Sequence, residues 1–137
     1  MVDELTTPLR FSIATEHDVA ALLVDTKNLL LRVGFCDTQL ALVKTIMAEL
    51  ATNILKYGRR GWLSLEESLR LDQRGIAIKA VDVGPGIDDI ESALIDGFST
   101  QGTLGIGLPS VRRMSDEFDI ESGDRGTTVK VTIWVWD

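Results

Sequence analysis

The sequence has little of several residue types, and each shortage excludes a class of protein. It has a single cysteine, Cys36, so no disulfide can form within the 137-residue chain. No apolar run approaches the roughly 20 residues of a membrane-spanning helix. The 14 basic residues are outnumbered by 21 acidic ones, and this net charge of −7 argues against sequence-independent nucleic-acid binding. The N-terminus lacks the order of a signal peptide, so we expect a cytoplasmic protein that binds neither membrane nor nucleic acid.

What is present is an ordinary globular composition, 45% hydrophobic, which predicts one domain over residues 1–137. Alternating apolar residues predict strands, and apolar residues spaced by three and four predict helices. The expected order is a strand (9–15), two helices (16–33 and 38–57), two strands (62–71 and 75–83), a loop region (84–107), a helix (108–118) and two strands (118–122 and 127–136). The turns "DQRG" and "GDRG" favour a mostly antiparallel sheet with helices on one face, an α+β two-layer sandwich.

The second helix and the strand after it should each bury one face. Asp37 or Thr38 is the expected N-cap of this helix, and Gly58 is its expected end. Its apolar stripe consists of Leu40, Val43, Met47, Leu50, Ile54 and Tyr57. The buried face of the following strand should hold Leu63, Leu65, Leu69 and Leu71.

The same helix carries three polar side chains beside its apolar stripe. Glu49 and Asn53, four residues apart, lie about 40° from each other around the helix axis, and Lys56 returns to the same face. An amide oxygen suits a hydrated Mg²⁺ whose other ligands are phosphates, and a carboxylate can accept a proton from a hydroxyl. A solvated face of paired charges is the alternative explanation.

A second polar signal is "VDVGPGI" (81–87), at the end of a strand. Alternation places Asp82 on the face of Ile76 and Ile78, where a carboxylate needs a hydrogen-bond donor. The exocyclic amine of adenine is such a donor, and Gly84 and Gly86 would let the chain approach a flat base. The alternative is an aspartate that caps a turn at a strand end.

The third signal is the glycine-rich run "GTLGIGLP" (102–109), which leads into a helix with Pro109 in its first turn. Free backbone amides and the positive end of the helix dipole could hold phosphate there. It is not a Walker loop, because no G-K-[ST] is present and residues 80–129 contain no lysine. A flexible connector is the alternative.

The order of these signals resembles the Bergerat-fold (GHKL) ATPases, which include gyrase and the histidine kinases. Within that superfamily, "AELATNI", "VDVGPGIDD", "GFSTQGTLGIGLPSVRRMSDEF" and "GTTVKV" look like the small serine/threonine kinases of bacterial sigma-factor regulation. They are most similar to the RsbT-type switch kinases of the stressosome. The resemblance covers residues from about 10 to 135.

The resemblance assigns roles to individual residues. Glu49 would be the catalytic base, Asn53 the Mg²⁺ ligand, and Asp82 the residue that reads adenine, supported by Thr127. The glycines would wrap the phosphates of ATP, while Ser99 and Thr100 would touch phosphate or partner, or cap a helix. The implied nucleotide contacts are Asn53, Asp82, Gly84, Gly86, Ile87, Ser99, Thr100, Gly102, Thr103, Leu104, Gly105, Ile106, Gly107, Leu108 and Thr127.

The implied function is an ATP- and Mg²⁺-dependent kinase that phosphorylates serine or threonine on STAS-domain partners in a stress-response pathway, with a PP2C-type phosphatase as a second partner. One alternative is an anti-sigma factor that uses ATP or ADP only as a conformational ligand. Another is an ATPase without a protein substrate, which fits poorly with so short a chain. His17, the only histidine, lacks the pattern of a phospho-acceptor and is expected at the surface.

Tryptophans suggest where a partner would bind. In the last strand Trp134 and Trp136 alternate with aliphatic residues, and Trp62 falls opposite Leu63. If helices cover only the aliphatic face, three tryptophans lie on the open face as a candidate interface. Packing at the sheet edge is the alternative.

Overall fold

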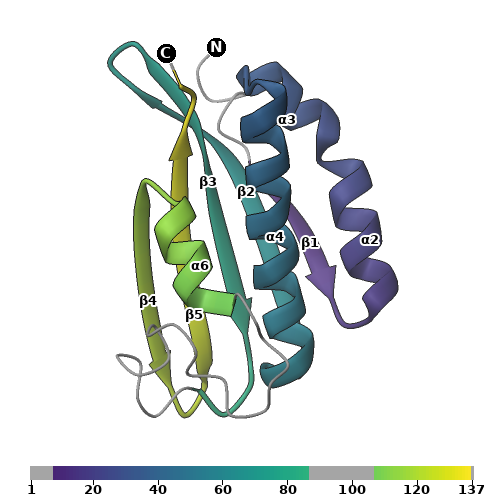
Figure 1. Cartoon of the computed structure of the whole chain (residues 1–137). Coiled ribbons are helices and arrows are strands. Elements are labelled where there is room, and N and C mark those ends of the chain that lie inside the picture. Colours follow the sequence, from purple (N-terminus) through teal and green to yellow (C-terminus); the bar gives the residue numbers. More distant parts are fainter. Residues whose placement is uncertain (1–7, 87–106, 137) are drawn as a thin grey trace.

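The computed structural model describes residues 8–86 and 107–136, and five strands within these ranges form one antiparallel sheet (Figure 1). The sheet order is β1-β2-β3-β5-β4. The strands are β1 (Leu9–Ile13), β2 (Gly61–Arg70), β3 (Gln73–Asp82), β4 (Glu117–Gly123) and β5 (Gly126–Trp134). The helices are α2 (Glu16–Asp25), α3 (Lys27–Val33), α4 (Asp37–Tyr57) and α6 (Gly107–Met114).

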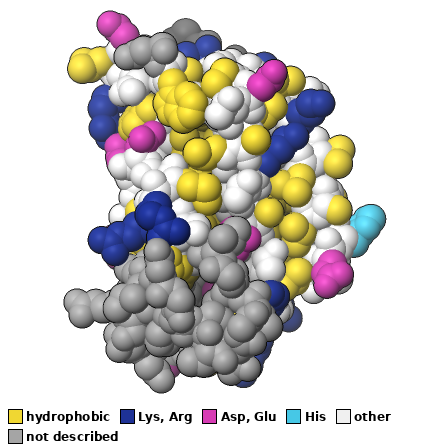
Figure 2. All heavy atoms as spheres, viewed as in Figure 1, with side chains coloured by type: hydrophobic (Ala, Val, Ile, Leu, Met, Phe, Trp, Pro, Cys, Tyr) yellow, Lys and Arg dark blue, Asp and Glu magenta, His cyan; other side chains and the backbone are white. Residues whose placement is uncertain are grey.

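The described helices cover one face of the sheet, and none of them lies on the other face (Figure 1). Helix α4 contacts β1, β2 and β3, and α6 lies against α4. One apolar cluster joins the two layers, with Leu50 and Ile54 of α4 and Ile78 of β3 in its interior. The α+β two-layer sandwich is thereby confirmed. Figure 2 shows the helix-covered face, where apolar side chains lie among basic and acidic ones.

Helix α4 confirms most of its predicted stripe. The predicted residues from Leu40 to Ile54 are buried, but Tyr57 is 43% exposed because it is the last helical residue. The helix ends at Gly58 as expected. The predicted N-cap is wrong: the helix already includes Asp37, and Cys36 occupies the cap position without a side-chain hydrogen bond.

The predicted single helix over 16–33 is two helices that meet at Thr26. The buried Thr26 hydroxyl donates to the Leu22 carbonyl at 2.7 Å, and the Thr26 amide donates to the same oxygen. A hydroxyl that bonds back into the preceding turn in this way bends a helix. At its other end α3 stops at Gly34, as the glycine predicted, in a left-handed conformation with φ of 110°.

The β2–β3 hairpin extends beyond the layer of helices, which overturns part of the predicted buried face. Leu63 and Leu65 are buried, but Leu69 is 49% exposed and Leu71 is 99% exposed. The turn is shorter than the predicted "DQRG", because Arg70 pairs with Gln73: β2 ends one residue before the predicted 71, and β3 begins two residues before the predicted 75. Leu71 lies in this turn with φ of 55°.

The inward position nearest the hairpin tip holds Glu67 instead of a leucine. Glu67 is 8% exposed, and the Nε of Arg74 donates to its carboxylate at 3.0 Å. A charged partner is what allows a carboxylate to be buried at this depth. The alternation of β2 therefore continues inward, but its last inward member is an ion pair.

The C-terminal elements differ from prediction at their ends. Helix α6 stops at Met114 instead of residue 118, and Glu117 already belongs to β4. Strand β5 ends at Trp134, because the Trp136 amide donates to Gln39 of α4 and turns the chain toward the helices. Trp136 therefore does not continue the open face.

The other two tryptophans remain on the open face, each with an arginine over its ring. The guanidinium carbon of Arg10 lies 3.9 Å from the Trp62 ring centroid, and that of Arg70 lies 4.8 Å from the Trp134 centroid. Trp134 is only 8% exposed. A tryptophan interface on the open face stays a prediction for this pair.

Candidate active site

Helix α4 brings two of the predicted residues, Glu49 and Asn53, to its partly buried side. Both are half-buried and lie next to the buried Leu50 and Ile54. Lys56 is exposed one turn further along, and its charge lowers the pKa of Glu49. The spacing of these residues on one face of the helix is as predicted.

Glu49 contacts the first residue of α6. The backbone N–H of Gly107 donates to Oε1 of Glu49 at 3.2 Å, although the two residues are 58 positions apart in the chain. Burial raises the pKa of Glu49, while the Gly107 hydrogen bond and the Lys56 charge act in the opposite direction. A carboxylate with a raised pKa is a better proton acceptor than an ordinary glutamate near neutral pH.

The side-chain oxygen of Asn53 has no hydrogen-bond partner. Oδ1 is buried, and among the described buried side-chain oxygen and nitrogen atoms it is the unpaired one. Leaving a buried acceptor unpaired costs on the order of 1–3 kcal/mol, so such an atom in a native site calls for an explanation. A ligand that bonds to Oδ1 would provide one.

Asp82 ends β3 with one carboxylate oxygen occupied. Oδ1 accepts from the Gly84 amide at 2.9 Å and from the Thr127 amide at 3.2 Å. These two bonds fix the orientation of the carboxylate. No described residue donates to Oδ2, so this oxygen can accept a donor from a ligand.

Glycines surround Asp82 because other residues would not fit. A Cβ on Gly58 would lie 2.6 Å from Oδ2 of Asp82, and a Cβ on Gly84 would lie 2.6 Å from the Tyr57 carbonyl oxygen. Gly86 and Gly126 have φ of 87° and 134°, and a Cβ on either would collide with a backbone carbonyl oxygen. The end of α4, the end of β3 and the β4–β5 turn therefore meet closely around one carboxylate.

Thr127 belongs to the same cluster. It is 8% exposed, and its hydroxyl shares a 2.7 Å hydrogen bond with the hydroxyl of Ser122 on β4. No sequence motif pointed to Ser122, and Gly58 was predicted only as the end of a helix. The signal for both was weak, because neither stands in a recognisable motif and each reaches the site through the pairing of distant segments.

The structure thus brings Asp82, Gly84, Gly86 and Thr127 together at one end of the sheet, and Glu49 together with Gly107 nearby on α4 and α6. Leu108, the second residue of α6, is half-buried. The other predicted contacts lie outside the described residues: Ile87, Ser99, Thr100, Gly102, Thr103, Leu104, Gly105 and Ile106.

Comparison with known proteins accounts for this arrangement. Residues 12–133 match the family model of the histidine kinase-like ATPase domain. The chain belongs to this family. It is 39% identical to the serine/threonine-protein kinase RsbT of Bacillus subtilis (strain 168) over 124 residues, which cover 90% of this chain and 93% of that relative. It is 29% identical to an anti-sigma F factor of Thermoanaerobacter sp. (strain X514) over 104 residues, 71% of each chain.

A solved structure supports the fold independently. The crystal structure of the RsbU and RsbW domains of a Mycobacterium tuberculosis protein matches with a TM-score of 0.65 at 18% identity. The match covers 93% of this chain but only 32% of that longer chain, so it bears on the fold alone.

These findings confirm the resemblance seen in the motifs. The chain is an ATP-binding protein serine/threonine kinase of the RsbT type, and its fold is that of the histidine kinase-like ATPases. None of the helices in the described ranges combines the length and apolar composition needed to cross a bilayer.

Proposed function

We propose that this protein transfers phosphate from Mg-ATP to a serine or threonine of a STAS-domain partner, as part of a partner-switching pathway. The observation that carries the proposal is the meeting of Glu49 with the N-terminus of α6. A proton acceptor then lies next to backbone amides that suit phosphate. One domain, spanning residues 1–137, would perform the whole reaction, and we expect it to act in the cytoplasm.

The adenine ring would be read by Asp82. Its free Oδ2 is an acceptor for the exocyclic amine, while Oδ1 stays bonded to the Gly84 and Thr127 amides. Gly86 lets the chain pack closely against the Gly123 carbonyl oxygen, which a Cβ would meet, and we propose that the backbone held there contacts the flat base. A carboxylate at this position favours a nucleobase that presents a hydrogen-bond donor, as adenine does with its exocyclic amine.

Magnesium would be held by Oδ1 of Asn53. The fit rests on the buried oxygen without a partner, since an amide oxygen is a suitable neutral ligand for Mg²⁺. No three His, Cys, Asp or Glu side chains cluster as metal ligands in the ranges that the structure describes. Phosphate oxygens and water would therefore complete the coordination and bring the metal with the nucleotide. Bound there, Mg²⁺ would neutralise charge on the phosphates.

The phosphates would contact the glycine-rich run. In the described part of it, Gly107 and Leu108 begin α6, where N–H groups without partners inside the helix and the helix dipole favour anions. The Gly107 N–H already donates to Glu49, so the phosphate would bind at the amides beside that contact. The same role is proposed for Gly102, Thr103, Leu104, Gly105 and Ile106. We also propose that Ile87, Ser99 and Thr100 line the nucleotide site.

Glu49 would act as the general base. It would take the proton from the hydroxyl of the target serine or threonine as the hydroxyl oxygen forms a bond to the γ-phosphorus. The bond from that phosphorus to the β–γ bridging oxygen breaks, and ADP leaves. Burial raises the pKa of Glu49 and strengthens it as a base.

The proposed partners rest on the resemblance to the switch kinases, and the relatives support a partner-switching role. The name RsbT denotes a serine/threonine kinase, and the solved neighbour joins an RsbU to an RsbW domain in one chain. We propose a STAS-domain protein as the phosphorylated partner and a PP2C-type phosphatase as the second one. The anti-sigma F relatives favour the alternative, in which ATP or ADP is a conformational ligand for sigma-factor capture.

Phosphate transfer to purified STAS-domain proteins distinguishes the kinase function from the anti-sigma alternative. The chain is incubated with radiolabelled ATP and Mg²⁺, and the phosphorylated site is mapped. We expect label on one serine or threonine of a STAS protein. Capture of a sigma factor that depends on nucleotide, without label on any STAS protein, would replace this function with the anti-sigma one.

A further inference from the structure

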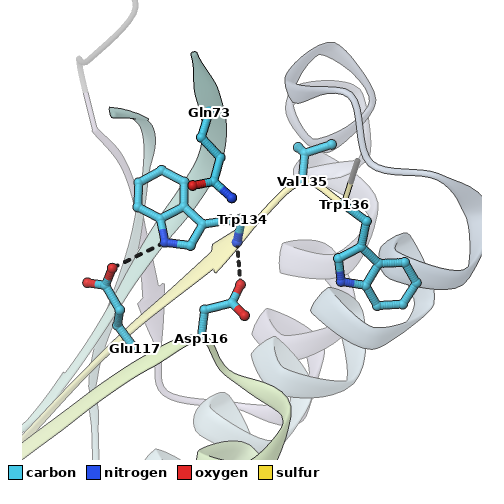
Figure 3. A pocket seen from close by; sticks show the side chains of 6 residues that line it. All are labelled: Gln73, Asp116, Glu117, Trp134, Val135 and Trp136. Carbon is cyan, nitrogen blue, oxygen red and sulfur yellow. Dashed lines mark hydrogen bonds between the residues drawn. The ribbon is translucent and has the colours of Figure 1, made fainter. Parts of the chain in front are cut away.

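A second pocket lies at the end of the sheet where β5 terminates (Figure 3). It has a volume of about 330 Å³ and is lined by Gln73, Asp116, Glu117, Trp134, Val135 and Trp136. Seven residues of extended strand separate Thr127 from Trp134, which corresponds to about 23 Å. The pocket is therefore distinct from the nucleotide site, at the opposite end of β5.

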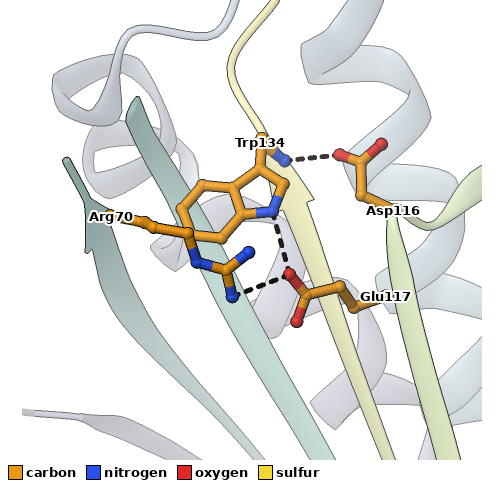
Figure 4. Close-up of polar contacts among 4 residues, drawn as sticks. All are labelled: Arg70, Asp116, Glu117 and Trp134. Carbon is orange, nitrogen blue, oxygen red and sulfur yellow. Dashed lines mark hydrogen bonds and ion pairs between the residues drawn. The ribbon is translucent and has the colours of Figure 1, made fainter. Parts of the chain in front are cut away.

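The pocket lining carries two negative charges and no positive one. Oδ2 of Asp116 accepts from the backbone N–H of Trp134 at 2.7 Å, and Oε2 of Glu117 accepts from its indole N–H at 3.1 Å (Figure 4). Oε2 also pairs with Arg70 at 3.0 Å. No described residue donates to the other oxygen of either carboxylate. Two acceptors remain for a charged donor from outside.

The aromatic residues of the pocket suit a cation as well. Arg70 already lies over the ring of Trp134, and Trp134 is only 8% exposed, so this ring is occupied within the protein itself (Figure 4). Trp136 is 53% exposed, and its ring is the one at the pocket that an added cation can reach. Aromatic rings next to carboxylates are a favourable environment for an arginine or lysine side chain.

The pocket is held in shape by one buried side chain. Gln39 is 1% exposed; its Nε2 donates to the Trp134 carbonyl at 2.8 Å and its Oε1 accepts from the Trp136 amide at 2.9 Å. The backbones of both tryptophans are thus fixed to α4 before any ligand arrives. Preformed binding groups lose less conformational entropy on binding.

Exposed leucines lie at the tip of the β2–β3 hairpin, which supplies Gln73 to the pocket, although neither belongs to the lining. Leu71, two residues from Gln73, is 99% exposed and has φ of 55°, and Leu69 is 49% exposed. The left-handed region is unfavourable for a residue with a side chain such as leucine. Contact with a polypeptide would bury these leucines, whereas a small cation would leave them in water.

We propose that this pocket receives an arginine or lysine side chain of a partner protein, with apolar neighbours of that residue resting on Leu69 and Leu71. The occupant is identified by charge complementarity with the open carboxylate oxygens of Asp116 and Glu117 and by the exposed ring of Trp136. The site does not depend on phosphate transfer. It would give the kinase a docking contact away from its nucleotide.

A short peptide tests the proposal directly. Acetyl-Leu-Arg-Leu-amide is titrated into the ¹⁵N-labelled protein, together with a matched peptide that has neutral citrulline in place of arginine. We expect the arginine peptide to shift the indole signals of Trp134 and Trp136 but not that of Trp62. The citrulline peptide should bind about tenfold more weakly, because it loses a charge-assisted hydrogen bond.

Matched variants separate the pocket from general charge attraction. Asp116→Asn and Glu117→Gln keep the shape and an acceptor oxygen, and each should weaken the arginine peptide by about fivefold to tenfold. Asp119→Asn and Glu121→Gln make the same charge change at exposed positions of β4 and should have no effect. Equal binding of the two peptides, equal loss in the control variants, or no shift at Trp134 and Trp136 would overturn the proposal. Spermidine binding as tightly as the arginine peptide would also overturn it, in favour of a small-cation site.

Discussion

The backbone N–H of Gly107 donates to Oε1 of Glu49 at 3.2 Å, joining the start of α6 to the middle of α4. The same helix end is where phosphate is proposed to bind. The hydrogen bond between Gly107 and Glu49 would therefore hold the general base next to the bound phosphate. A partner hydroxyl that reaches this point would lie close to both.

The raised pKa of Glu49 predicts how this site affects stability. A carboxyl whose pKa is higher in the folded state favours folding at low pH, and that contribution is lost as pH rises through the folded pKa. Glu49→Gln cannot ionise and should be more stable than the wild-type protein at neutral pH, with the difference shrinking as the pH falls below the ordinary value of 4.5. Urea unfolding at neutral pH and at a pH below 4.5 measures the difference in the free energy of unfolding between the two proteins. Glu121→Gln is the control, and an advantage that is the same at both pH values would contradict the prediction.

Asp82→Asn should weaken ATP binding about 10- to 100-fold, because a donor replaces the acceptor offered to adenine and a bond to a charged group is worth roughly 1.5–3 kcal/mol. Calorimetric titration with ATP gives the affinity. Asp119→Asn, an exposed aspartate on β4, serves as the matched change. ATP affinity that is unchanged in Asp82→Asn would remove this residue from base recognition.

Asn53→Ala should reduce the effect of Mg²⁺ on ATP affinity without a large loss of protein stability. We expect the variant to lose most of the difference in ATP affinity between solutions with Mg²⁺ and with EDTA. Its unfolding temperature without nucleotide should not fall much, because the substitution removes a buried oxygen that has no partner. A large drop in stability combined with an intact Mg²⁺ effect would show that Asn53 is structural.

The β4–β5 turn offers a pair of glycine substitutions. Gly126→Ala should destabilise the fold by about 2–4 kcal/mol, because its φ is 134° and a Cβ would collide with the Asp82 carbonyl oxygen. Gly123→Ala, three residues earlier, should cost little, since a Cβ there has no atom within 4 Å. Chemical unfolding of both variants is the measurement. Equal losses would mean that the turn, and not the packing against Asp82, sets the cost.

Much of the fold could be predicted from the sequence, because its apolar residues recur at clear helical and strand spacings. The stripe of α4 and the alternation of β3 and β5 each place their apolar residues toward one shared core. The prediction failed where tertiary structure overrides a local pattern. Leu69 and Leu71 continue the alternation of β2 but extend past the helices, so no neighbour buries them.

Sequence motifs predicted the main residues of the candidate site. They did not predict the contacts between distant segments that bring these residues together. "VDVGPGI" indicated Asp82, but the bond from the Thr127 amide depends on the pairing of β3 with β5. The second pocket had no motif at all. Gln39, which holds both of its tryptophans, is a buried polar residue 95 positions away from Trp134.

Phosphate transfer by Glu49→Gln tests the proposed function most directly. The substitution keeps an acceptor oxygen for the Gly107 amide but removes the base. We predict that transfer from radiolabelled ATP to a STAS-domain partner falls about 10²- to 10⁴-fold while ATP affinity stays close to that of the wild-type protein. Transfer that survives Glu49→Gln at the wild-type rate would contradict the role of Glu49 and the mechanism built on it.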